Sequence, residues 1–599
     1  MVATIETTSL KGGEFLIKET EASQVFVPEE FTEEQQMIAD TCRDFLRTEI
    51  HPILNEIDHA KSPELISSLM DKAGALGLLG TAVPEAYGGF GMNFNTSMLV
   101  AEVLGTGYSF SVAQSAHTGI GTLPIVYYGN EFLKAKYLPN LASGVWKAAY
   151  CLTEPDSGSD ANGAKTKAVL TEDGKHYKIT GQKMWITNGG FADIFIVFAK
   201  IDDDKNLTAF VVEKGFGGIT MNEPEHKMGI KGSDTRQIFF NDCMVPVENL
   251  LSTRENGFKI AVNILNIGRI KLGVAAVGGS KGVINEAIKY ANDRKQFGIS
   301  IGRFGAIKHK LAQIATKIWV SESANYRAGQ NIDDLIESLV STGLTDEEAK
   351  LKALEQYAIE CAIMKVHGSE ILDYTVDEGV QIFGGMGYSA DAPMDRAYRD
   401  SRINRIFEGT NEINRLLILD MYLKRAMKGE LDLLGPATAV GKEIMSIPDF
   451  GADDDDVIFG AEKKVLKNMK KAALMIAGSA VQKFMMKLNH EQELLMNVAD
   501  MIIEVYACES AILRAEKLIG IKGQEALALQ TDMVRIYMQD AVANVNAAGR
   551  EAIQSYAEGD ELRVMLMGLK RFTKIEPFNT KEARRRVADA LLAENKYIF

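Results

Sequence analysis

Residues 150–160 read Tyr-Cys-Leu-Thr-Glu-Pro-Asp-Ser-Gly-Ser-Asp, and this stretch lies where two different sequence patterns meet. Before it, over about residues 32–149, apolar residues recur at spacings of three and four, which predicts helices. After it, to about residue 250, short β-rich runs are separated by turn signals such as Asp173-Gly174, which predicts hairpins. The stretch therefore marks the entry from a helical domain into a β domain.

From residue 258 onward the pattern is helical again. Long helices are predicted near 258–293, 303–330 and 347–383, and an apolar stripe predicts another near 494–513. The chain has only 13 prolines but 25 methionines, so helix breakers are few and flexible apolar filler is plentiful. The predicted fold is α+β and mainly α, with six segments in this order: a loose N-terminal arm (1–30), an N-terminal helical domain (31–149), a middle antiparallel β domain (150–257), a C-terminal helical bundle of four-helix type (258–434), an acidic linker (435–460) and an extra C-terminal helical domain (461–599).

The composition limits the class of protein. At roughly 150 residues per domain, the 599 residues amount to about four domains' worth of chain. Apolar residues make up 46% and charged residues 25%, which excludes a disordered, collagen-like or disulfide-scaffold protein. Lys and Arg total 66 and Asp and Glu total 81, and the resulting net charge of −15 argues against a nucleic-acid binder.

Cysteine usage and the first residues bear on the compartment. Five scattered cysteines without a CxxC pair are typical of reduced, buried thiols in a cytosolic protein. The first ten residues, MVATIETTSL, have neither the basic and apolar regions of a secretory signal nor the arginines of a transit peptide. No uncharged apolar run reaches the length of about 18 residues that a spanning helix needs. We therefore expect a cytoplasmic protein.

Several familiar motifs do not apply. Gly278-Gly-Ser-Lys-Gly282 matches the GxSxG pattern of a hydrolase nucleophile, but helical pattern on both sides favours a contact between helices through small residues. Neither GxGxxG nor GxxxxGK[ST] occurs, so no dinucleotide fingerprint or phosphate loop is predicted. The eight histidines show no ligand spacing, and no metal site is predicted.

Four further stretches combine residues suited to binding or catalysis: 183–190 (KMWITNGG), 293–298 (DRKQFG), 381–388 (QIFGGMGY) and 405–413 (RIFEGTNEI). Trp185 could cover an aromatic cofactor or be an ordinary core residue. Arg294 and Phe297 could bind phosphate and stack on adenine, although a basic last helical turn capped by Gly298 explains them equally well. Glu408 follows Ile and Phe, and an apolar environment would tune it toward general-base duty near neutral pH. Alternatively, it sits in the first turn of a helix, where it favours the dipole.

Taken together and in this order, these stretches resemble the acyl-CoA dehydrogenase family. Residues 151–163 match the family's first signature and residues 381–400 its second, and both are long, specific patterns. The resemblance covers about residues 30–430, with the family's order of helical domain, β domain and helical bundle. Very-long-chain acyl-CoA dehydrogenases and their close relatives carry a helical extension after a linker, and this chain is similar to that branch in architecture.

The resemblance implies noncovalently bound FAD and a homodimer or homotetramer. The residues that would line the flavin and its ribityl chain are Tyr150, Leu152, Thr153 and Ser159, and those that would cover its ring are Trp185 and Thr187. The residues that would reach the FAD of a neighbouring subunit are Arg294, Gln296, Phe297, Gln381, Gly384 and Gly385. Thr410 and Glu412 would contact the pyrophosphate or adenosine side.

The resemblance also implies that Glu408 is the catalytic base. It would take the α-proton of an acyl-CoA thioester while a hydride leaves the β-carbon for the flavin, and the Glu408 N–H would stabilise the enolate oxygen. Some relatives carry the base just before an arginine on another helix, but Gly268 precedes the matching Arg269 here, which favours Glu408. The residues that would contact the substrate are Phe407 and Gly409 beside the thioester, and Ser159, Asn266 and Arg269 beside CoA.

The implied activity is the oxidation of a fatty acyl-CoA to a trans-2-enoyl-CoA in β-oxidation, with an electron-transfer flavoprotein as electron acceptor. Val112, Ala116 and Thr118 would line the far end of the acyl pocket, where small or uncharged residues leave room for long chains. Three alternatives stay open: a dehydrogenase for short, branched or aromatic acyl-CoA, an oxidase that uses O₂, and a protein of this fold that acts mainly as an assembly or scaffold partner. The presence of Glu408 and both signatures favours an enzyme over a scaffold.

The helical extension contains a basic stretch near residues 462–488. Its lysines and apolar residues are Lys463, Lys464, Lys467, Lys470 and Lys471, and Met469, Leu474 and Met475. A basic amphipathic helix can lie on an anionic membrane, so one hypothesis is peripheral membrane contact. The other is that this stretch is the solvated face of a packed bundle helix.

Overall fold

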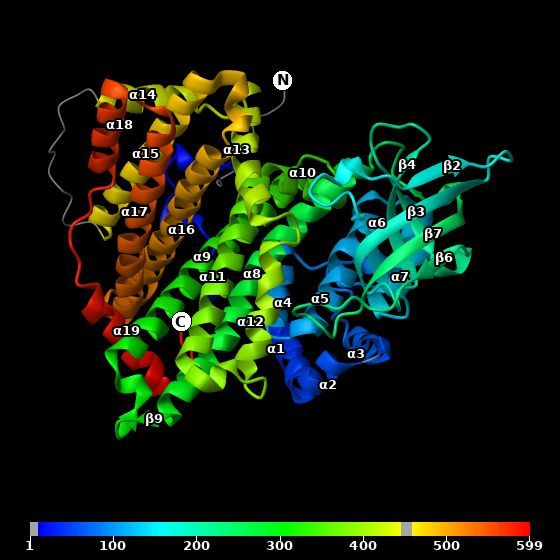
Figure 1. Cartoon of the computed structure of the whole chain (residues 1–599), viewed down its shortest axis with the longest axis horizontal. Coiled ribbons are helices and arrows are strands. Elements are labelled where there is room, and N and C mark those ends of the chain that lie inside the picture. The colour runs from blue at the N-terminus through cyan, green and yellow to red at the C-terminus, as the bar shows by residue number, and fades with distance from the viewer. Residues whose placement is uncertain (1–9, 61, 445–457) are drawn as a thin grey trace.

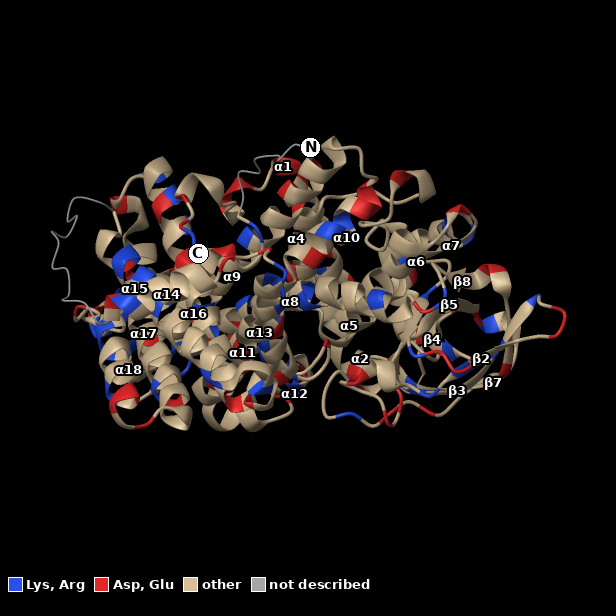
Figure 2. Cartoon of the chain, turned by 90° about the horizontal axis from the view of Figure 1, so that it is seen from above, with Lys and Arg blue, Asp and Glu red and all other residues tan. Residues whose placement is uncertain are grey.

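The computed structural model describes residues 10–60, 62–444 and 458–599. Figure 1 shows a β sheet at one end of the long axis, the helical extension at the other end and a bundle of long helices between them. The mainly helical α+β fold predicted from the sequence is confirmed. Charged residues of both signs are interspersed along the bundle and extension helices in the view of Figure 2.

The N-terminal helical domain begins where the sequence predicts. The Thr32 side chain accepts a hydrogen bond from the Gln35 N–H at 3.3 Å, and the Gln35 side chain accepts one from the Thr32 N–H at 2.9 Å, which is a capping box. The helices of this domain are α1 (Glu33–Phe45), α2 (Leu54–His59), α3 (Glu64–Ala75), α4 (Phe94–Leu104), α5 (Tyr108–Ser115), α6 (Leu123–Tyr128) and α7 (Glu131–Ser143). A π-helical turn, Ala116–Gly121, continues α5.

The β domain contains an eight-stranded sheet in the order β6-β7-β3-β2-β4-β5-β8, with β1 paired to β4. Its strands are β1 (Ala148–Cys151), β2 (Lys167–Leu170), β3 (His176–Thr187), β4 (Ile194–Ile201), β5 (Thr208–Glu213), β6 (Ile219–Met221), β7 (Thr235–Pro246) and β8 (Leu250–Leu251). The hairpin expected at Asp173-Gly174 is the antiparallel β2–β3 pair.

The sheet is mainly antiparallel, as predicted, but β1 and β2 both run parallel to β4. The two short strands pair with different parts of β4: Ala148–Cys151 lies beside residues 194–197, and the β2 residues Lys167 and Ala168 lie beside Lys200 and Ile201. After β1 the chain leaves the sheet through residues 152–166, and it returns as β2 beside the same neighbour, β4. The loop that carries the first signature is therefore the connection between two parallel strands.

The central bundle packs around the long helix α8. Its elements are α8 (Gly257–Asp293), the small hairpin β9 (Lys295–Gln296) and β10 (Ile299–Ser300), α9 (Gly305–Ser341), α10 (Asp346–Gln356), α11 (Ala358–Phe383), α12 (Pro393–Ser401) and α13 (Asn411–Met427). Helix α9 is longer than predicted, and the helix expected at 347–383 is two helices that meet at Tyr357. Where α8 crosses α11, a Cβ on Gly368 would lie 2.6 Å from the Gly273 carbonyl oxygen, so only glycine permits this approach.

The GxSxG stretch is part of α8 and not a nucleophile elbow. A Cβ on Gly278 would lie 1.8 Å from the carbonyl oxygen of Glu102 on α4, and the Ser280 hydroxyl donates to the Ala276 carbonyl within the helix. The predicted contact between helices through small residues is confirmed. Helix α8 is also the one helix among the described residues that is long and apolar enough to cross a membrane, and 72% of that apolar window is buried inside the protein, as in a core helix.

The N-terminal arm is not loose over its described part. Residues 10–30 lie between the central bundle and the extension, and Phe15, Leu16, Val25 and Val27 are buried in the core. The segment is also held by ion pairs: Glu29 with Arg514 at 2.8 Å, and Glu30 with Lys517 at 2.6 Å. The polar residues that suggested a loose arm are its contacts with the extension.

The extension consists of α14 (Leu434–Ile444), α15 (Gly460–Phe484), α16 (Gln492–Lys522), α17 (Ala528–Tyr556), α18 (Gly559–Phe572) and α19 (Thr580–Glu594). Residues 434–444 are thus helical where a linker was expected, because α14 packs on α15. The acidic run at 453–456 lies outside the described residues.

The membrane hypothesis for the basic helix does not fit the structure. Met469, Leu474 and Met475 of α15 are buried inside the extension, so they form no apolar face for a membrane. Three of its lysines are neutralised within the protein: Lys463 pairs with Glu516 at 2.6 Å, Lys467 with Glu19 at 2.9 Å and Lys471 with Glu443 at 2.7 Å. Lys470 pairs with Glu509 in the same way. The alternative hypothesis, a packed bundle helix, describes α15.

Candidate active site

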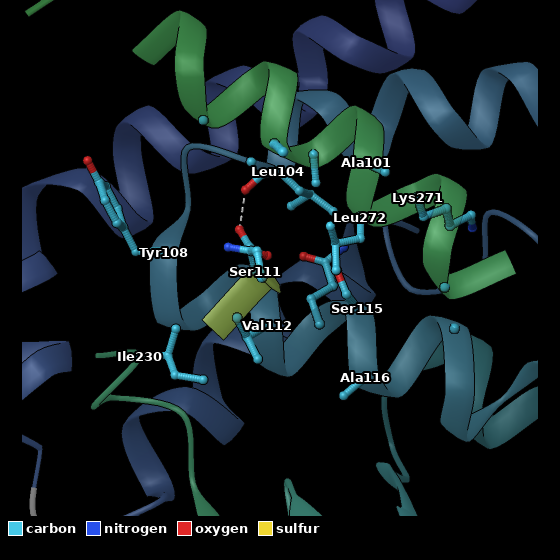
Figure 3. A pocket seen from close by; sticks show the side chains of 18 of the residues that line it. Ala101, Leu104, Tyr108, Ser111, Val112, Ser115, Ala116, Ile230, Lys271 and Leu272 are labelled. Atoms are coloured by element: carbon cyan, nitrogen blue, oxygen red, sulfur yellow. Dashed lines mark hydrogen bonds between the residues drawn. The ribbon is translucent and has the colours of Figure 1, made fainter. Parts of the chain in front are cut away.

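A cavity of about 250 Å³ opens between α4, α5, the π-helical turn after α5, and α8, with the segment around Glu408 on one wall. We call it the central cavity. Val112, Ala116 and Thr118 line it, as predicted. Figure 3 shows Ser111, Ser115 and Leu272 gathered around its middle, with Tyr108 and Lys271 at opposite sides. The lining is mostly apolar, which suits a hydrocarbon chain.

Glu408 lies in the loop before α13, and its backbone adopts a left-handed conformation that is rare for residues other than glycine. Its φ is +62° and that of Gly409 is +81°. The Oε2 atom of Glu408 is buried and has no hydrogen-bond partner among the described residues. A Cβ on Gly268 would lie 2.6 Å from this oxygen, so the missing side chain of Gly268 leaves room for the carboxylate. A strained, unpartnered carboxylate on the wall of a cavity is an arrangement found at functional sites.

The surroundings of Glu408 keep it close to half-ionised at neutral pH. Burial raises the pKa of its carboxyl to about 7, against the positive charges of Arg269 and then Lys365, which lower it. Tyr150, at the end of β1, has a buried hydroxyl without a partner among the described residues. Burial and then the charge of Glu408 hold the pKa of this hydroxyl well above its usual range. Glu408 is therefore suited to accept a proton near pH 7.

The loop that carries Glu408 is held from two helices. Arg269 on α8 donates from Nε to the Glu408 carbonyl at 3.1 Å and from a terminal nitrogen to Asn266 at 2.9 Å. Asn414 on α13 donates to the carbonyls of Gly409 at 2.8 Å and Thr410 at 3.0 Å. The Glu408 N–H has no hydrogen-bond acceptor among the described residues, so it remains available to a ligand oxygen.

The predicted CoA contacts of Arg269 and Asn266 do not fit this arrangement. Arg269 is 5% exposed and Asn266 2% exposed, and neither lies on the wall of the central cavity. The planar guanidinium instead holds the backbone carbonyl of Glu408. Phe407 and Glu408 do line the cavity, whereas Gly409 does not. Ser159 is exposed in the loop after β1, away from these buried groups.

The residues expected beside the flavin ring lie at one edge of the sheet. Trp185 is 52% exposed and adopts a left-handed φ of +61°, and Thr187 at the end of β3 lines the central cavity. The Met184 N–H donates to the Thr153 carbonyl at 2.8 Å, which ties the signature loop to β3. An exposed tryptophan beside a cavity fits a flat aromatic cofactor. Tyr150 and Leu152 are nearly buried behind this edge. They therefore support the residues at the edge and offer little surface of their own to a cofactor.

A second group of predicted residues lies at the far end of α8. From Gly268 to Arg294 the helix extends roughly 39 Å, at 1.5 Å per residue. Gln296 and Phe297 are exposed on the turn beyond it, and Phe297 is 94% exposed with a left-handed φ of +53°. The stacked rings of Tyr290 and Phe383, 4.1 Å apart, bring the end of α11 to the same place.

The exposed residues at the end of α11 belong to this second group. They are Gln381, Gly384 and Gly385, and an added Cβ on either glycine would meet no heavy atom within 4 Å. The structure does not bring this group to Glu408 within one chain, and its contact with a neighbouring subunit's FAD stays a prediction. Thr410 caps α13 by accepting a hydrogen bond from the Ile413 N–H at 3.3 Å, and Glu412 is exposed in the first turn of that helix.

The sequence reasoning missed two polar residues of the site. Lys365 and Asn411 are buried behind the Glu408 loop and are hydrogen-bonded to each other at 2.6 Å. A single lysine within the apolar run Cys-Ala-Ile-Met-Lys-Val of α11 was the available signal, because an unpaired lysine is rare in a helix that is buried all round.

Comparisons with known proteins agree with this geometry. Four stretches match family models: residues 32–145 the N-terminal domain of acyl-CoA dehydrogenases, residues 149–243 the middle domain, and residues 255–423 and 468–571 two models of the C-terminal domain. The chain belongs to the acyl-CoA dehydrogenase family. It is therefore an oxidoreductase that acts on CH–CH donors, and FAD is its cofactor.

Three relatives show how far the likeness extends. A probable acyl-CoA dehydrogenase of Bacillus subtilis is 46% identical over 98% of both chains. A very long-chain specific mitochondrial acyl-CoA dehydrogenase of Macaca fascicularis is 35% identical over 87% of this chain and 81% of its own length. The crystal structure of an acyl-CoA dehydrogenase complexed with FAD from Bacillus anthracis has a TM-score of 0.95 and 45% identity, and it covers 99% of this chain and 100% of that one.

The residues present fit FAD. An aromatic ring exposed at the sheet edge, a threonine on the cavity wall and buried donors behind them are suited to a flat ring. Trp185, Thr187 and Thr153 are the residues that would hold the ring here. When bound, FAD supplies the oxidant that accepts two electrons from the substrate.

Proposed function

We propose that this acyl-CoA dehydrogenase oxidises medium-chain to long-chain fatty acyl-CoA thioesters to the trans-2-enoyl-CoA and passes the electrons to an electron-transfer flavoprotein. The observation that carries the proposal is the position of Glu408. Its carboxylate lies on the wall of an apolar cavity, opposite Gly268, with a pKa of about 7.

The chain's own residues account for the first half of the reaction. The α C–H of a thioester is a weak acid, so removal of its proton needs a base that is available in its ionised form and a donor for the enolate oxygen. Glu408 meets the first requirement because its pKa of about 7 leaves about half of it ionised at neutral pH, and its Oε2 has no competing partner among the described side chains. Its backbone N–H meets the second, since it has no acceptor within the described chain. Base and donor belong to one residue, so both are aligned by the same strained loop.

The cavity supports the choice of substrate. Small residues of α8 and of the π-helical turn after α5, such as Ala275, Gly279 and Ala116, leave space along its wall. Lys271 is the cationic exception on this wall. The match to a very long-chain specific relative extends into the extension, which favours long chains over the short, branched or aromatic alternative.

Location, assembly and electron acceptor are also part of the proposal. A cytoplasmic location is supported by five free, buried cysteines. A homodimer or homotetramer is supported by the second group of residues around Phe297, which is too far from Glu408 to serve the same flavin. We do not extend the proposal to membrane contact through α15, because its apolar face is buried.

The test is an anaerobic titration of the purified holoenzyme with acyl-CoAs from four to twenty carbons. Bleaching of the flavin absorption by medium-chain and long-chain substrates is expected, together with its loss in Glu408→Gln that retains FAD. Electron-transfer flavoprotein should then restore the colour of the reduced enzyme. Absence of bleaching with every acyl-CoA, or unchanged bleaching in Glu408→Gln, would refute the proposal.

A further inference from the structure

Lys365 on α11 is a fully buried lysine close to the catalytic loop, and the reaction scheme above does not use it. It is 0% exposed and does not line the central cavity. Its ammonium has three N–H groups, but within the described chain it makes one hydrogen bond, to Asn411 Oδ1 at 2.6 Å. A buried ammonium without a carboxylate beside it is costly, so its presence calls for an explanation.

Asn411 connects this lysine to the base. It is the first residue of α13 and follows Glu408 by three positions. Its amide nitrogen donates to Ser369 at 3.1 Å and to Glu370 at 3.0 Å, both one turn further along α11. Helix α11 thus holds the start of α13 through both the oxygen and the nitrogen of the Asn411 side-chain amide. The Asn411 contacts and those of Arg269 and Asn414 fix the loop from three helices.

The titratable groups around Glu408 come from three elements. Arg269 on α8 and Lys365 on α11 are the cations that oppose the effect of burial on its pKa, and Tyr150 on β1 is the neutral group that faces it. Around Lys365, burial lowers the pKa to about 8, and the charge of Glu408 is the largest effect that raises it, followed by the lowering effect of Arg269 and the raising effects of Glu370 and Glu412. Glu408 and Lys365 therefore favour each other's charged forms.

We propose that Lys365 is a positioning residue of this active site: it anchors the Glu408 loop through Asn411, and its buried positive charge favours the carboxylate form of the base. Lys365 touches neither the cavity nor the reacting atoms, so it acts only through Glu408. The inference rests on the proposed function in that it takes Glu408 as the base.

The first experiment compares three holoenzymes: wild type, Lys365→Gln and Lys365→Arg. The rate of flavin bleaching by one long-chain acyl-CoA is measured from pH 5.5 to 9.5, with FAD content and melting temperature recorded for each. In Lys365→Gln, which keeps a donor for Asn411 but has no charge, the inflection should move up by about one unit, so the rate at pH 7 falls roughly fivefold. At pH 9.5 the two rates should converge, since Glu408 is then ionised in both proteins. Lys365→Arg should keep the inflection near that of wild type.

A second pair of variants leaves Lys365 in place. Asn411→Asp keeps the acceptor but adds a negative charge beside the ammonium, so it should move the inflection in the same direction as Lys365→Gln. Lys289→Gln is the control, because it removes the charge of an exposed lysine on α8 that pairs with Glu286 and does not line the central cavity. Its inflection should stay in place.

A readout without turnover separates this inference from the proposed function. The infrared band of the protonated Glu408 carboxyl, identified as the band absent from Glu408→Gln, can be titrated in each variant without any acyl-CoA. An upward shift in Lys365→Gln and Asn411→Asp supports the inference even if no acyl-CoA bleaches the flavin. An unchanged titration in both variants, or an equal shift in Lys289→Gln, overturns it.

Discussion

Gly268 and Glu408 face each other at van der Waals contact: a Cβ on Gly268 would lie 2.6 Å from the Glu408 Oε2 and 2.7 Å from its carboxyl carbon. Helix α8 thus comes as close to the Glu408 carboxylate as a residue without a side chain permits. Gly268→Ala should displace the carboxylate by several tenths of an ångström. We expect the rate of flavin bleaching to fall on the order of tenfold or more, because proton transfer depends steeply on position. FAD content should be unchanged, and Gly279→Ala, on the same cavity wall, is the control; an equal loss in both variants would contradict the contact.

The ionisation of Glu408 should be visible in the stability of the protein. Its pKa is raised by folding to about 7, so the folded state favours the protonated form, and the associated stability is full below the unfolded pKa and lost as the pH rises through 7. Glu408→Gln mimics the protonated form. It should therefore raise the free energy of unfolding by roughly 1–3 kcal/mol at pH 8.5 but by less than about 1 kcal/mol at pH 5. Urea unfolding of the two holoenzymes at both pH values checks this; a gain of the same size at pH 5 would exclude the linkage.

Lys271 should weaken the binding of a hydrocarbon chain in the central cavity, because it is a cation on a mostly apolar wall. It lines the cavity and has no hydrogen-bond or ion-pair partner among the described residues. Burial, with a smaller effect of Lys350, lowers its pKa to about 8, so it is mostly protonated at pH 7 and mostly neutral at pH 9.5. Lys271→Met should lower the KM for long-chain acyl-CoA several-fold at pH 7 and much less at pH 9.5.

The control for that variant is Lys289→Met, an exposed lysine on the same helix that pairs with Glu286. It should leave the KM unchanged at both pH values. A gain in Lys271→Met that does not depend on pH would point to size and not charge as the cause.

Arg514 should be among the most sensitive positions outside the active site. Its guanidinium is buried between Glu29 of the N-terminal segment at 2.8 Å and Glu322 of α9 at 2.7 Å. Removing one member of a buried ion network leaves uncompensated charge, so Arg514→Leu should cost about 3–5 kcal/mol of unfolding free energy. Arg563→Leu, at an exposed pair with Asp560, should cost less than about 1 kcal/mol. Thermal unfolding followed by circular dichroism distinguishes the two, and equal melting temperatures would refute the assignment.

Much of the fold could be predicted because its signals are local. The capping box at Thr32, the turn at Asp173-Gly174 and the apolar spacing of α8 each depend on residues that are near one another in the chain. What failed depends on distant partners. The polar residues of 10–30 gave no sign that they pair with the extension, and nothing local shows that β1 and β2 run parallel to β4.

The same division applies to the site. Glu408 stood out because its neighbours in the sequence are apolar and a glycine follows it, and the resemblance to the family implied that it is the base. Arg269 and Asn266 were assigned to CoA by likeness alone, whereas both are buried: Arg269 donates to the Glu408 carbonyl, and Asn266 accepts a hydrogen bond from Arg269. Lys365 was missed because its role depends on Asn411, 46 positions away.

The packing of residues 10–30 also constrains how the chain is made. Glu29 meets Arg514 across 485 positions, so the beginning of the protein cannot complete its contacts until nearly all of the chain has left the ribosome. Domains tend to fold in the order of synthesis, but residues 10–30 complete their packing only after the C-terminal extension has been made. Phe15, Leu16 and Val27 therefore lack part of their final packing for most of the chain's synthesis. Trimming either terminus to obtain a minimal enzyme would leave the other end without its partner.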